Sequence, residues 1–340
     1  MMAPNLLIVL SFLCIIRSSS GIGISELTDE DAANRVFVNT MFKKRIPAKK
    51  VKRNIVLSPV GVYFAASMAV QLIDLKTYKS WSVVTSTFKF KQTQNIFENQ
   101  PQITSQSLIA GERWSKIVGS KVPKFSMPNY KLFDTVDVIE MEKFMKVNLS
   151  ELNGALDAIV HKLTFAAEWE TPFERYKNVD FSDGNTYKFM QSTINHASSF
   201  DSPQLRMITI PFKSLNKKRK IVIDFIVPQR ESNYINLAHH GTWVKNSVTS
   251  KQTIVTIPKV KINYKTPLTL FRDKDIDALQ RVKVEWDEKG ATGEAVTAIF
   301  SRSIIRPSYF VIDRPFYFVI RMGNLWLFTG YVSKIDKDFN

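Results

Sequence analysis

The chain has 340 residues, of which 44% are hydrophobic, and it contains 24 Phe and 6 Trp. This is enough apolar material for a large buried core, which excludes an intrinsically disordered chain. Lys and Arg number 47 against 31 Asp and Glu, so the net charge of +16 favours anionic over cationic partners.

The first 21 residues have the pattern of a secretory signal peptide. An apolar run from Leu6 to Ile16 is too short to span a bilayer, and it is followed by Arg17 and by small residues up to Gly21. The only cysteine, Cys14, lies in this leader, so the exported chain is expected to contain no disulfide. We therefore predict a signal peptide over 1–21 and a single domain over 22–340 that is secreted into the extracellular space, has no membrane anchor and is a monomer.

Helix signals are clearest in the first third of the exported chain. Apolar residues at helical spacing and a capping pattern favour one helix, and Ser58 followed by Pro59 supplies the N-cap and first residue of another. This second helix is apolar on nearly all sides, so it belongs in the interior. Helices are predicted over 26–42, over 59–73 and around 80–88.

Strand signals occur on both sides of these helices and dominate the rest of the chain. Gly323 and Asn324, which tolerate positive φ, join two strongly apolar runs in a pattern typical of a hairpin. Strands are predicted over 54–57, 133–141, 157–169, 205–212, 221–227, 253–264, 282–286, 316–322 and 325–332. The fold class is therefore α+β with a large share of sheet.

Motifs for catalysis and for cofactors are missing. The chain has no H-E-x-x-H, no nucleophile elbow, no P-loop and no dinucleotide glycine pattern. The adjacent pair His239 and His240 is typical of a loop, because neighbouring side chains rarely face one metal ion. We predict a protein that is not an enzyme, with no catalytic residue, no metal and no cofactor. Asn148, in Asn-Leu-Ser, is the single acceptor pattern for N-glycosylation.

Basic residues gather most densely between residues 43 and 53. The cluster comprises Lys43, Lys44, Arg45, Lys49, Lys50, Lys52 and Arg53, and a smaller one covers 217–220. One interpretation is a site for a heparin-like polyanion, and the other is a solvated charge run beside structured elements. Nucleic acid is the polyanion least expected for an exported chain.

A run of small residues follows the strand that ends at Trp286. Ala291, Gly293, Ala295 and Thr297 have the same parity, so in a strand they would share one face. Such a face can enter a tight space between other strands. The alternative interpretation is a flexible surface loop.

Five motifs in chain order carry a family resemblance. They are Asn54–Pro59, Phe165–Trp169 with Pro172 and Phe173, Ile257–Lys261, Asp313–Arg321 and Leu327–Val332. Together they resemble the serpin family over nearly the whole exported chain. The resemblance implies a mixed large sheet A, two further sheets, surrounding helices and an exposed reactive-centre loop, here at about 288–306.

The resemblance also implies a mechanism. In inhibitory serpins a protease cleaves the loop, and the loop then inserts into sheet A as an extra strand while the acyl-enzyme is trapped. The matching hinge residues here are Glu288, Gly290, Ala291, Gly293, Ala295 and Thr297. The usual loop length places the scissile bond between Ile304 and Ile305, which suits an elastase- or chymotrypsin-like protease, whereas Arg302–Ser303 would suit a trypsin-like one.

Some positions depart from the family pattern. Gly61 replaces a serine, His161 an asparagine and Gln280 a histidine, all in a hydrogen-bond network that normally controls the opening of sheet A. The stretch from Met141 to Ala155 is also short for the helix that crosses this sheet, helix F. The leading hypothesis is a secreted inhibitor of an extracellular serine protease. The alternative is a non-inhibitory serpin that acts as a protease substrate, carrier or binding protein.

Overall fold

The computed structural model describes residues 53–72, 97, 100–121, 130–213, 219–230, 234–267, 279–291 and 307–336. The chain packs as two compact units. The first takes Met1–Ala33, Val60–Phe165 and Leu268–Ala278, and the second takes Asn34–Pro59, Ala166–Pro267 and Leu279–Asn340. The helices predicted over 26–42 and 80–88 lie outside the described residues, and the single domain over 22–340 stays a prediction.

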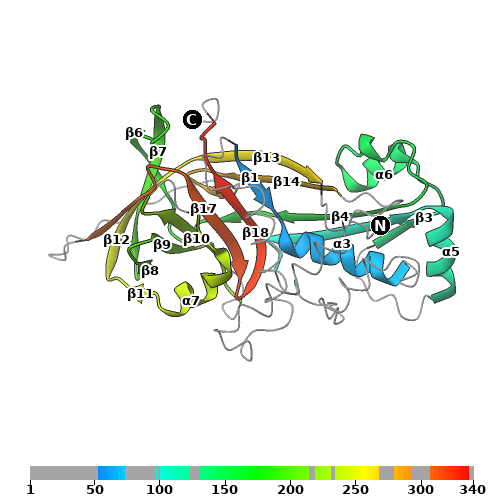
Figure 1. Cartoon of the computed structure of the whole chain (residues 1–340), viewed down its shortest axis with the longest axis horizontal. Coiled ribbons are helices and arrows are strands. Elements are labelled where there is room, and N and C mark those ends of the chain that lie inside the picture. The colour runs from blue at the N-terminus through cyan, green and yellow to red at the C-terminus, as the bar shows by residue number, and fades with distance from the viewer. Residues whose placement is uncertain are drawn as a thin grey trace, which may run out of the picture. The chain divides into compact units, whose positions relative to one another are not determined.

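The described residues of the first unit form a three-stranded sheet and three α-helices. Its strand order is β3-β2-β4, with β2 parallel to β3 and antiparallel to β4. The strands are β2 (Ile103–Ala110), β3 (Tyr130–Phe133) and β4 (Ala158–Phe165), and the helices are α3 (Pro59–Leu72), α5 (Glu112–Lys121) and α6 (Val138–Met145), followed by the short 3-10 helix η3 (Ser150–Leu152) (Figure 1). The apolar helix predicted from residue 59 is therefore confirmed as α3.

The strand predicted over 133–141 is wrong, because β3 ends at Phe133 and α6 begins at Val138. The Asp137 side chain caps the helix by accepting a hydrogen bond from the Glu140 amide at 3.1 Å. Met141 and Met145, four residues apart, bury one face of α6 against the sheet. The helix has only eight residues, as expected from the short stretch after Met141.

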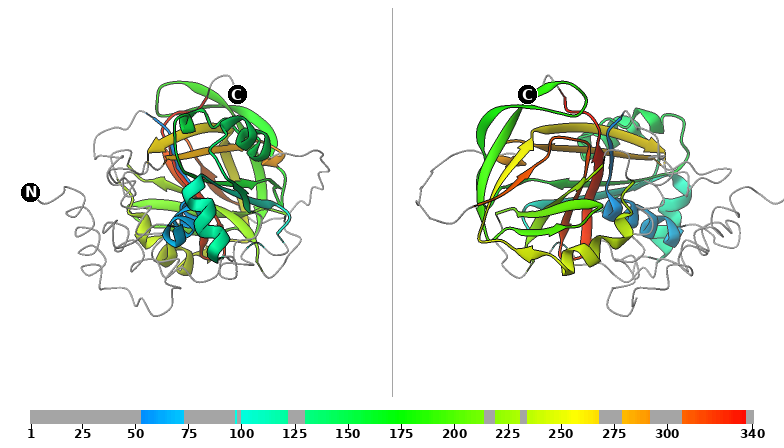
Figure 2. Two further views of the ribbon diagram at one scale, coloured as in Figure 1. Left: turned by 90° about the vertical axis from the view of Figure 1, so that its right-hand side faces the viewer. Right: turned by 60° about the vertical axis from the view of Figure 1, so that its left-hand side comes forward.

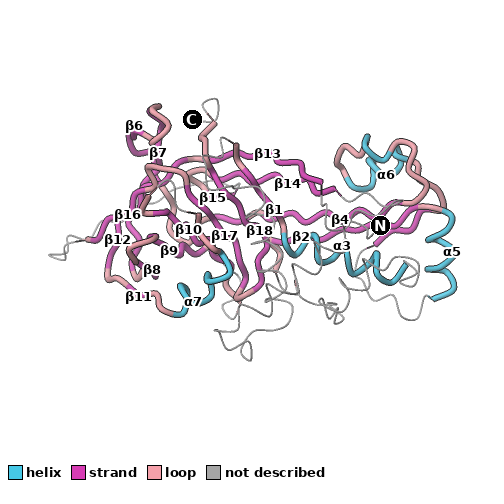
Figure 3. Tube along the Cα trace, viewed as in Figure 1, coloured by secondary structure: helices cyan, strands magenta, loops and turns pink. Residues whose placement is uncertain are grey.

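The described strands of the second unit form two larger sheets and two separate strand pairs. Its short helix α7 (His240–Lys245) follows the 3-10 helix η4 (Leu237–His239). A seven-stranded sheet has the order β1-β18-β17-β10-β9-β8-β11, a four-stranded sheet has the order β16-β12-β7-β6, and β13–β14 and β15–β5 form two separate pairs. Strands, drawn in magenta in Figure 3, outweigh the helices in the described part of the chain, in keeping with the predicted α+β class.

The bounds of these strands are as follows. The seven-stranded sheet uses β1 (Ile55–Leu57), β18 (Leu325–Val332), β17 (Phe316–Met322), β10 (Ile221–Pro228), β9 (Leu205–Pro211), β8 (Ser198–Asp201) and β11 (Val248–Thr249). The four-stranded sheet uses β16 (Ser308–Val311), β12 (Gln252–Pro258), β7 (Thr186–Asn195) and β6 (Glu174–Asp180). The pairs are β13 (Val260–Pro267) with β14 (Leu279–Trp286), which lie side by side in both views of Figure 2, and β15 (Gly290–Ala291) with β5 (Ala167–Glu168).

The hairpin predicted near the C-terminus is confirmed. β17 and β18 pair antiparallel, and Gly323 in the turn has a φ of 60°, which a glycine adopts without strain. Nearly every residue of both strands is buried, because the sheet is covered on both faces. The strands predicted at 205–212, 221–227 and 282–286 are also present as β9, β10 and β14.

Two predicted strands are divided in the structure. Residues 253–264 form β12 and β13, which belong to different sheets, and the change occurs at Lys259. Pro258 has no amide hydrogen to continue the ladder, so the chain leaves the first sheet there. Residues 157–169 form β4 and β5 with a break at Ala166. Among the described helices, none is long and apolar enough to cross a membrane.

Candidate functional site

The strand β14 leads through a tight turn into the first residues of the small-residue segment. Gly290 and Ala291 form β15 and pair antiparallel with β5, where Gly290 lies opposite Glu168 and Ala291 opposite Ala167. The turn itself is closed by a hydrogen bond of 2.9 Å from the Lys289 amide to Asp287 Oδ1. The root of this segment is thus already part of a small sheet.

Aromatic residues beside β5 hold the backbone of the turn. The Trp169 indole Nε1 donates to the Asp287 carbonyl at 2.7 Å, and the Phe173 amide donates to the Glu288 carbonyl at 3.1 Å. Trp169 is almost fully buried and stacks on Phe212 with ring centres 4.7 Å apart. Because these rings are packed, the two carbonyls are fixed in place.

Glu288 forms a partly buried ion pair at the same turn. Its Oε1 lies 3.6 Å from Lys259 Nζ, and the two side chains are 25% and 10% exposed. Lys259 is the residue at which the chain passes from β12 to β13, so this ion pair links the turn to the junction of two sheets. Removing either partner would leave a charge in a place with little water.

A second polar contact lies at the beginning of β14. The side chain of Gln280 accepts from the Ser58 amide at 3.1 Å and donates to the Ser58 carbonyl at 2.8 Å, and both residues are buried. Ser58 Oγ donates to the Leu327 carbonyl at 2.8 Å. Glutamine at position 280 therefore makes a two-bond contact with the residue that precedes α3.

In the first unit, His161 of β4 occupies a partly buried place between β2 and α3. Its Nδ1 lies 2.9 Å from Ser107 Oγ, and its ring centre lies 4.9 Å from that of Phe64. Among the described residues its Nε2, which is sealed from solvent, has no hydrogen-bond partner. Burial lowers the pKa of His161 to about 4, so the imidazole is neutral at physiological pH.

Comparison with known proteins shows which proteins the chain is similar to. No protein-family model matches the chain. Plasminogen activator inhibitor 1 of the pig, Sus scrofa, is 24% identical, and the match covers 86% of this chain and 90% of the relative. Serpin48 of the insect Tenebrio molitor has the same fold, with a TM-score of 0.67, 16% identity and coverage of 93% of this chain and 100% of that one. This chain has the serpin fold.

The superfamily contains members with different roles, and its inhibitory members inhibit proteases rather than acting as enzymes. Human thyroxine-binding globulin complexed with thyroxine superposes with a TM-score of 0.68 at 15% identity, covering 90% of this chain and 98% of that one. Likeness at this level of identity shows the fold alone, so the role of this chain has to be argued from its own residues.

The structure describes part of the predicted reactive-centre loop. Of the predicted hinge residues, Gly290 and Ala291 pair with β5, and the Glu288 carbonyl accepts from the Phe173 amide. Gly293, Ala295, Thr297 and the bonds Arg302–Ser303 and Ile304–Ile305 lie outside the described residues. The chain is described again from Pro307, and β16 then pairs parallel with β12, with Ser308 opposite Thr253.

The predicted polyanion and glycosylation residues are also only partly described. Lys43, Lys44, Arg45, Lys49, Lys50 and Lys52 lie outside the described residues, and Arg53 is exposed. Asn148 is exposed between α6 and η3, and Ser150 Oγ donates to Asn148 Oδ1 at 2.8 Å. The acceptor and the hydroxyl of the Asn-Leu-Ser pattern thus lie in contact at the surface.

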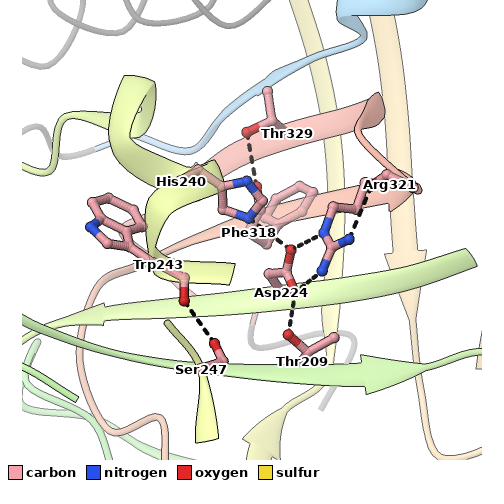
Figure 4. A network of polar contacts seen from close by, with 9 residues as sticks. Thr209, Asp224, His240, Trp243, Ser247, Phe318, Arg321 and Thr329 are labelled. Atoms are coloured by element: carbon pink, nitrogen blue, oxygen red, sulfur yellow. Dashed lines mark hydrogen bonds and ion pairs between the residues drawn. The ribbon is translucent and has the colours of Figure 1, made fainter. Parts of the chain in front are cut away.

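A buried charge cluster escaped the sequence reasoning. Asp224 on β10 accepts from Thr209 Oγ1 at 2.6 Å, from Arg321 Nε at 2.5 Å and from the ring of His240 at 2.7 Å (Figure 4). Burial by itself would raise the pKa of Asp224, but Arg321 and His240 outweigh it and hold that pKa well below its usual range. An aspartate inside an apolar strand was the signal that could have revealed the cluster.

This cluster does not have the form of an active site. Asp224 and His240 are 0% and 1% exposed, so no substrate reaches them. The hydroxyl of Thr209 bonds to the carboxylate and not to the imidazole, so it has no base beside it. Within the described part of the chain, no group of His, Cys, Asp and Glu has the composition of a metal site.

Proposed function

We propose that this serpin is a secreted inhibitor of an extracellular serine protease that acts as a suicide substrate. The observation that carries the proposal is the pairing of Gly290 and Ala291 with β5, because the loop then already has its first two residues in strand geometry. Cleavage would allow the pairing to continue along the chain. Small residues at 291, 293, 295 and 297 support this, since they suit the inward face of an inserting strand.

Insertion needs a fixed pivot as well as small residues. The carbonyls of Asp287 and Glu288 are held by Trp169 and by the Phe173 amide, so the backbone before Gly290 is anchored. The loop can therefore move about Gly290 while β14 stays in place. Glycine suits a pivot because its φ and ψ are the least restricted of all residues.

The bond that we propose for cleavage is Ile304–Ile305, with Arg302–Ser303 as the alternative. An elastase- or chymotrypsin-like protease would cut the first and a trypsin-like protease the second. Incubation of the purified protein with each class should give a covalent complex that survives SDS with one of them. Mass spectrometry of the released C-terminal peptide identifies the bond.

A pair of hinge variants tests whether insertion is the mechanism. Ala291→Arg should abolish complex formation while cleavage continues, because a charge would have to enter the closing sheet. Glu294→Arg is the matched control, because residue 294 has the opposite parity and its side chain would face solvent. Loss of inhibition in both variants, or in neither, would contradict the assigned register.

The alternative is a non-inhibitory serpin that serves as a protease substrate, carrier or binding protein. The short α6 favours it, because the helix that crosses sheet A takes part in the insertion step and here has eight residues. Cleavage of the loop by every protease class without any covalent complex would establish this alternative. It would also refute the inhibitor proposal.

A heparin-like polyanion is the second partner that we propose, with the basic cluster 43–53 as its contact. The net charge of +16 supports this choice. Neutralising Lys49, Lys50, Lys52 and Arg53 should lower retention on immobilised heparin, and more so at low salt. Unchanged retention would assign the cluster to solvation alone.

A further inference from the structure

Asn153 and Gly154 form the only Asn-Gly pair in the chain, and they occupy an exposed turn between η3 and β4. The Asn153 backbone has φ −58° and ψ 122°, and Gly154 has φ 83°. The Ala155 amide donates to the Leu152 carbonyl at 3.0 Å and closes the turn. These angles and this bond are those of a type II turn, whose third residue has a positive φ that favours glycine.

The side chain of Asn153 and the amide of Gly154 are both accessible. Both residues are exposed, and a Cβ built on Gly154 would meet no described atom within 4 Å apart from its chain neighbours. In the described part of the chain, neither the Asn153 side chain nor the Gly154 amide forms a hydrogen bond. The amide nitrogen is therefore not held away from the carboxamide beside it.

These two groups can react with each other. The Gly154 nitrogen attacks Asn153 Cγ to form a five-membered succinimide, the Cγ–Nδ2 bond breaks, and Nδ2 leaves as ammonia with the amide proton. One water molecule then opens the ring. Cleavage of the new N–Cγ bond gives aspartate, and cleavage of the original backbone C–N bond gives isoaspartate. No oxidant or reductant is needed, and solvent water is the only co-reactant. We propose that Asn153 deamidates spontaneously through this succinimide and is a site of isoaspartate formation.

The folded turn slows this reaction but does not prevent it. Ring closure requires the ψ of Asn153 to rotate away from 122°, so that the Gly154 nitrogen faces Cγ. The rotation breaks the hydrogen bond between Ala155 and Leu152, a loss that slows ring closure about five-fold relative to a free peptide. Gly154 follows the rotation readily, because glycine has no Cβ to clash with the backbone.

A second exposed turn shows what protection from this reaction requires. Gly184 has a φ of 84°, but its amide donates to the Phe181 carbonyl at 3.0 Å. The carboxylate of Asp183 accepts from the Asn185 amide at 2.9 Å and from the Tyr187 hydroxyl at 2.8 Å. The side chain and the following amide are thus both held in this turn, and neither is held in the first one.

Deamidation changes both the charge and the backbone of the turn. The product carries one more negative charge, and isoaspartate adds one methylene to the main chain between residues 153 and 154. The hydrogen bond between Leu152 and Ala155 does not fit the longer chain. Leu152 packs against the buried cluster that contains Met145 and Leu149, so we expect the isoaspartate form to unfold at a lower temperature than the aspartate form.

This chemistry does not depend on cleavage or insertion of the reactive-centre loop, so it goes beyond the proposed function. The test follows the tryptic peptide 147–162 during several weeks near neutral pH, in protein from a bacterial host that attaches no glycan at Asn148. We expect residue 153 to exchange NH for O in mass and to become a substrate for a protein isoaspartate methyltransferase. The rate should be about five-fold below that of a synthetic peptide of residues 149–156, and it should rise with pH because the attacking nitrogen must lose its proton.

Three variants locate the reaction and test its control. Asn153→Gln should abolish the acidic form, because glutamine would have to close a six-membered ring. Asp183→Asn creates a second Asn-Gly pair in the turn whose glycine amide is hydrogen-bonded, so residue 183 should react at least about five-fold more slowly than residue 153 of the same molecule. Asn246→Gln, which removes another exposed asparagine, should leave the rate unchanged.

Three results would overturn the proposal. The first is an unchanged residue 153 in the protein after the synthetic peptide has been fully converted. The second is an acidic form that accumulates equally in Asn153→Gln and in the wild type. The third is an equal rate at residues 153 and 183 of Asp183→Asn, which would show that the hydrogen bond of the glycine amide does not control the reaction. Mass spectrometry of the wild type locates the change directly, so a poorly folded variant leaves the test intact.

Discussion

Protonation of His161 should weaken the first unit as the pH falls below neutrality. The folded protein lowers the pKa of this imidazole from 6.5 to about 4, because burial penalises the charged form. An unfolded chain therefore binds one more proton than the folded chain between these two values. Stability from the neutral ring is fully present above pH 6.5 and is lost as the pH falls toward 4.

The size of the effect follows from the shift. Integrating the difference in bound protons from pH 7 to pH 5 gives a loss of about 2 kcal/mol at most, since one pKa unit corresponds to about 1.4 kcal/mol. His161 as a whole residue is only partly buried, so the loss should lie below this figure. The described side chains that contact the ring, Ser107 and Phe64, carry no charge, and burial alone accounts for the lowered pKa.

Two measurements check this reasoning. Urea unfolding at pH 7 and pH 5 should show a smaller pH dependence for His161→Gln than for the wild type, whereas His239→Gln, which removes an exposed ring, should retain it. NMR titration of the four histidines gives the pKa of His161 directly, with the variant as its assignment. A midpoint near 6.5 for that resonance would refute the argument from burial.

Three further changes have outcomes fixed by the structure. Asp224→Asn should lower the free energy of unfolding by about 3–5 kcal/mol in urea titrations, because Arg321 loses its buried partner; a loss below 1 kcal/mol would show that the pair is not strongly coupled. Lys259→Met should lower the urea midpoint and speed cleavage near Gly290 by proteases, since Glu288 loses its ion pair. Equal cleavage rates in the wild type and the variant would contradict a role of this ion pair in holding the turn. Asn148→Gln should remove any mobility shift that a peptide N-glycosidase produces in protein secreted from eukaryotic cells, and a shift that persists would disprove this site.

The sequence predicted best those strands whose own residues carry the information. β10 and β17 are apolar runs interrupted only by Asp224 and Arg321, and their burial in the structure needs no knowledge of their partners. The strand prediction for residues 133–141 was wrong because the apolar residues of this segment fit the two-residue period of a strand as well as the period of a helix. The choice between the two was made by the Asp137 cap and by packing of Met141 and Met145 against a sheet.

In the candidate site, too, local sequence patterns point to some residues, whereas contacts between distant segments are not recorded in any local pattern. The resemblance assigns Glu288 and Ala291 to a hinge from their distance along the chain to a recognisable motif, and this assignment stays a prediction. The partner of Glu288 could not, since Lys259 approaches it only through the pairing of β13 with β14. The Asp224 cluster likewise joins residues from β9, β10, α7 and β17, and no local pattern records such a meeting.

Gln280 and His161, two of the departures from the family pattern, both make polar contacts in the structure. Gln280 satisfies both backbone groups of Ser58, and two such buried hydrogen bonds contribute about 1 kcal/mol each. His161 keeps a hydrogen bond to Ser107 but leaves Nε2 without a described partner. The polar contacts at these positions are therefore changed in chemistry and not lost.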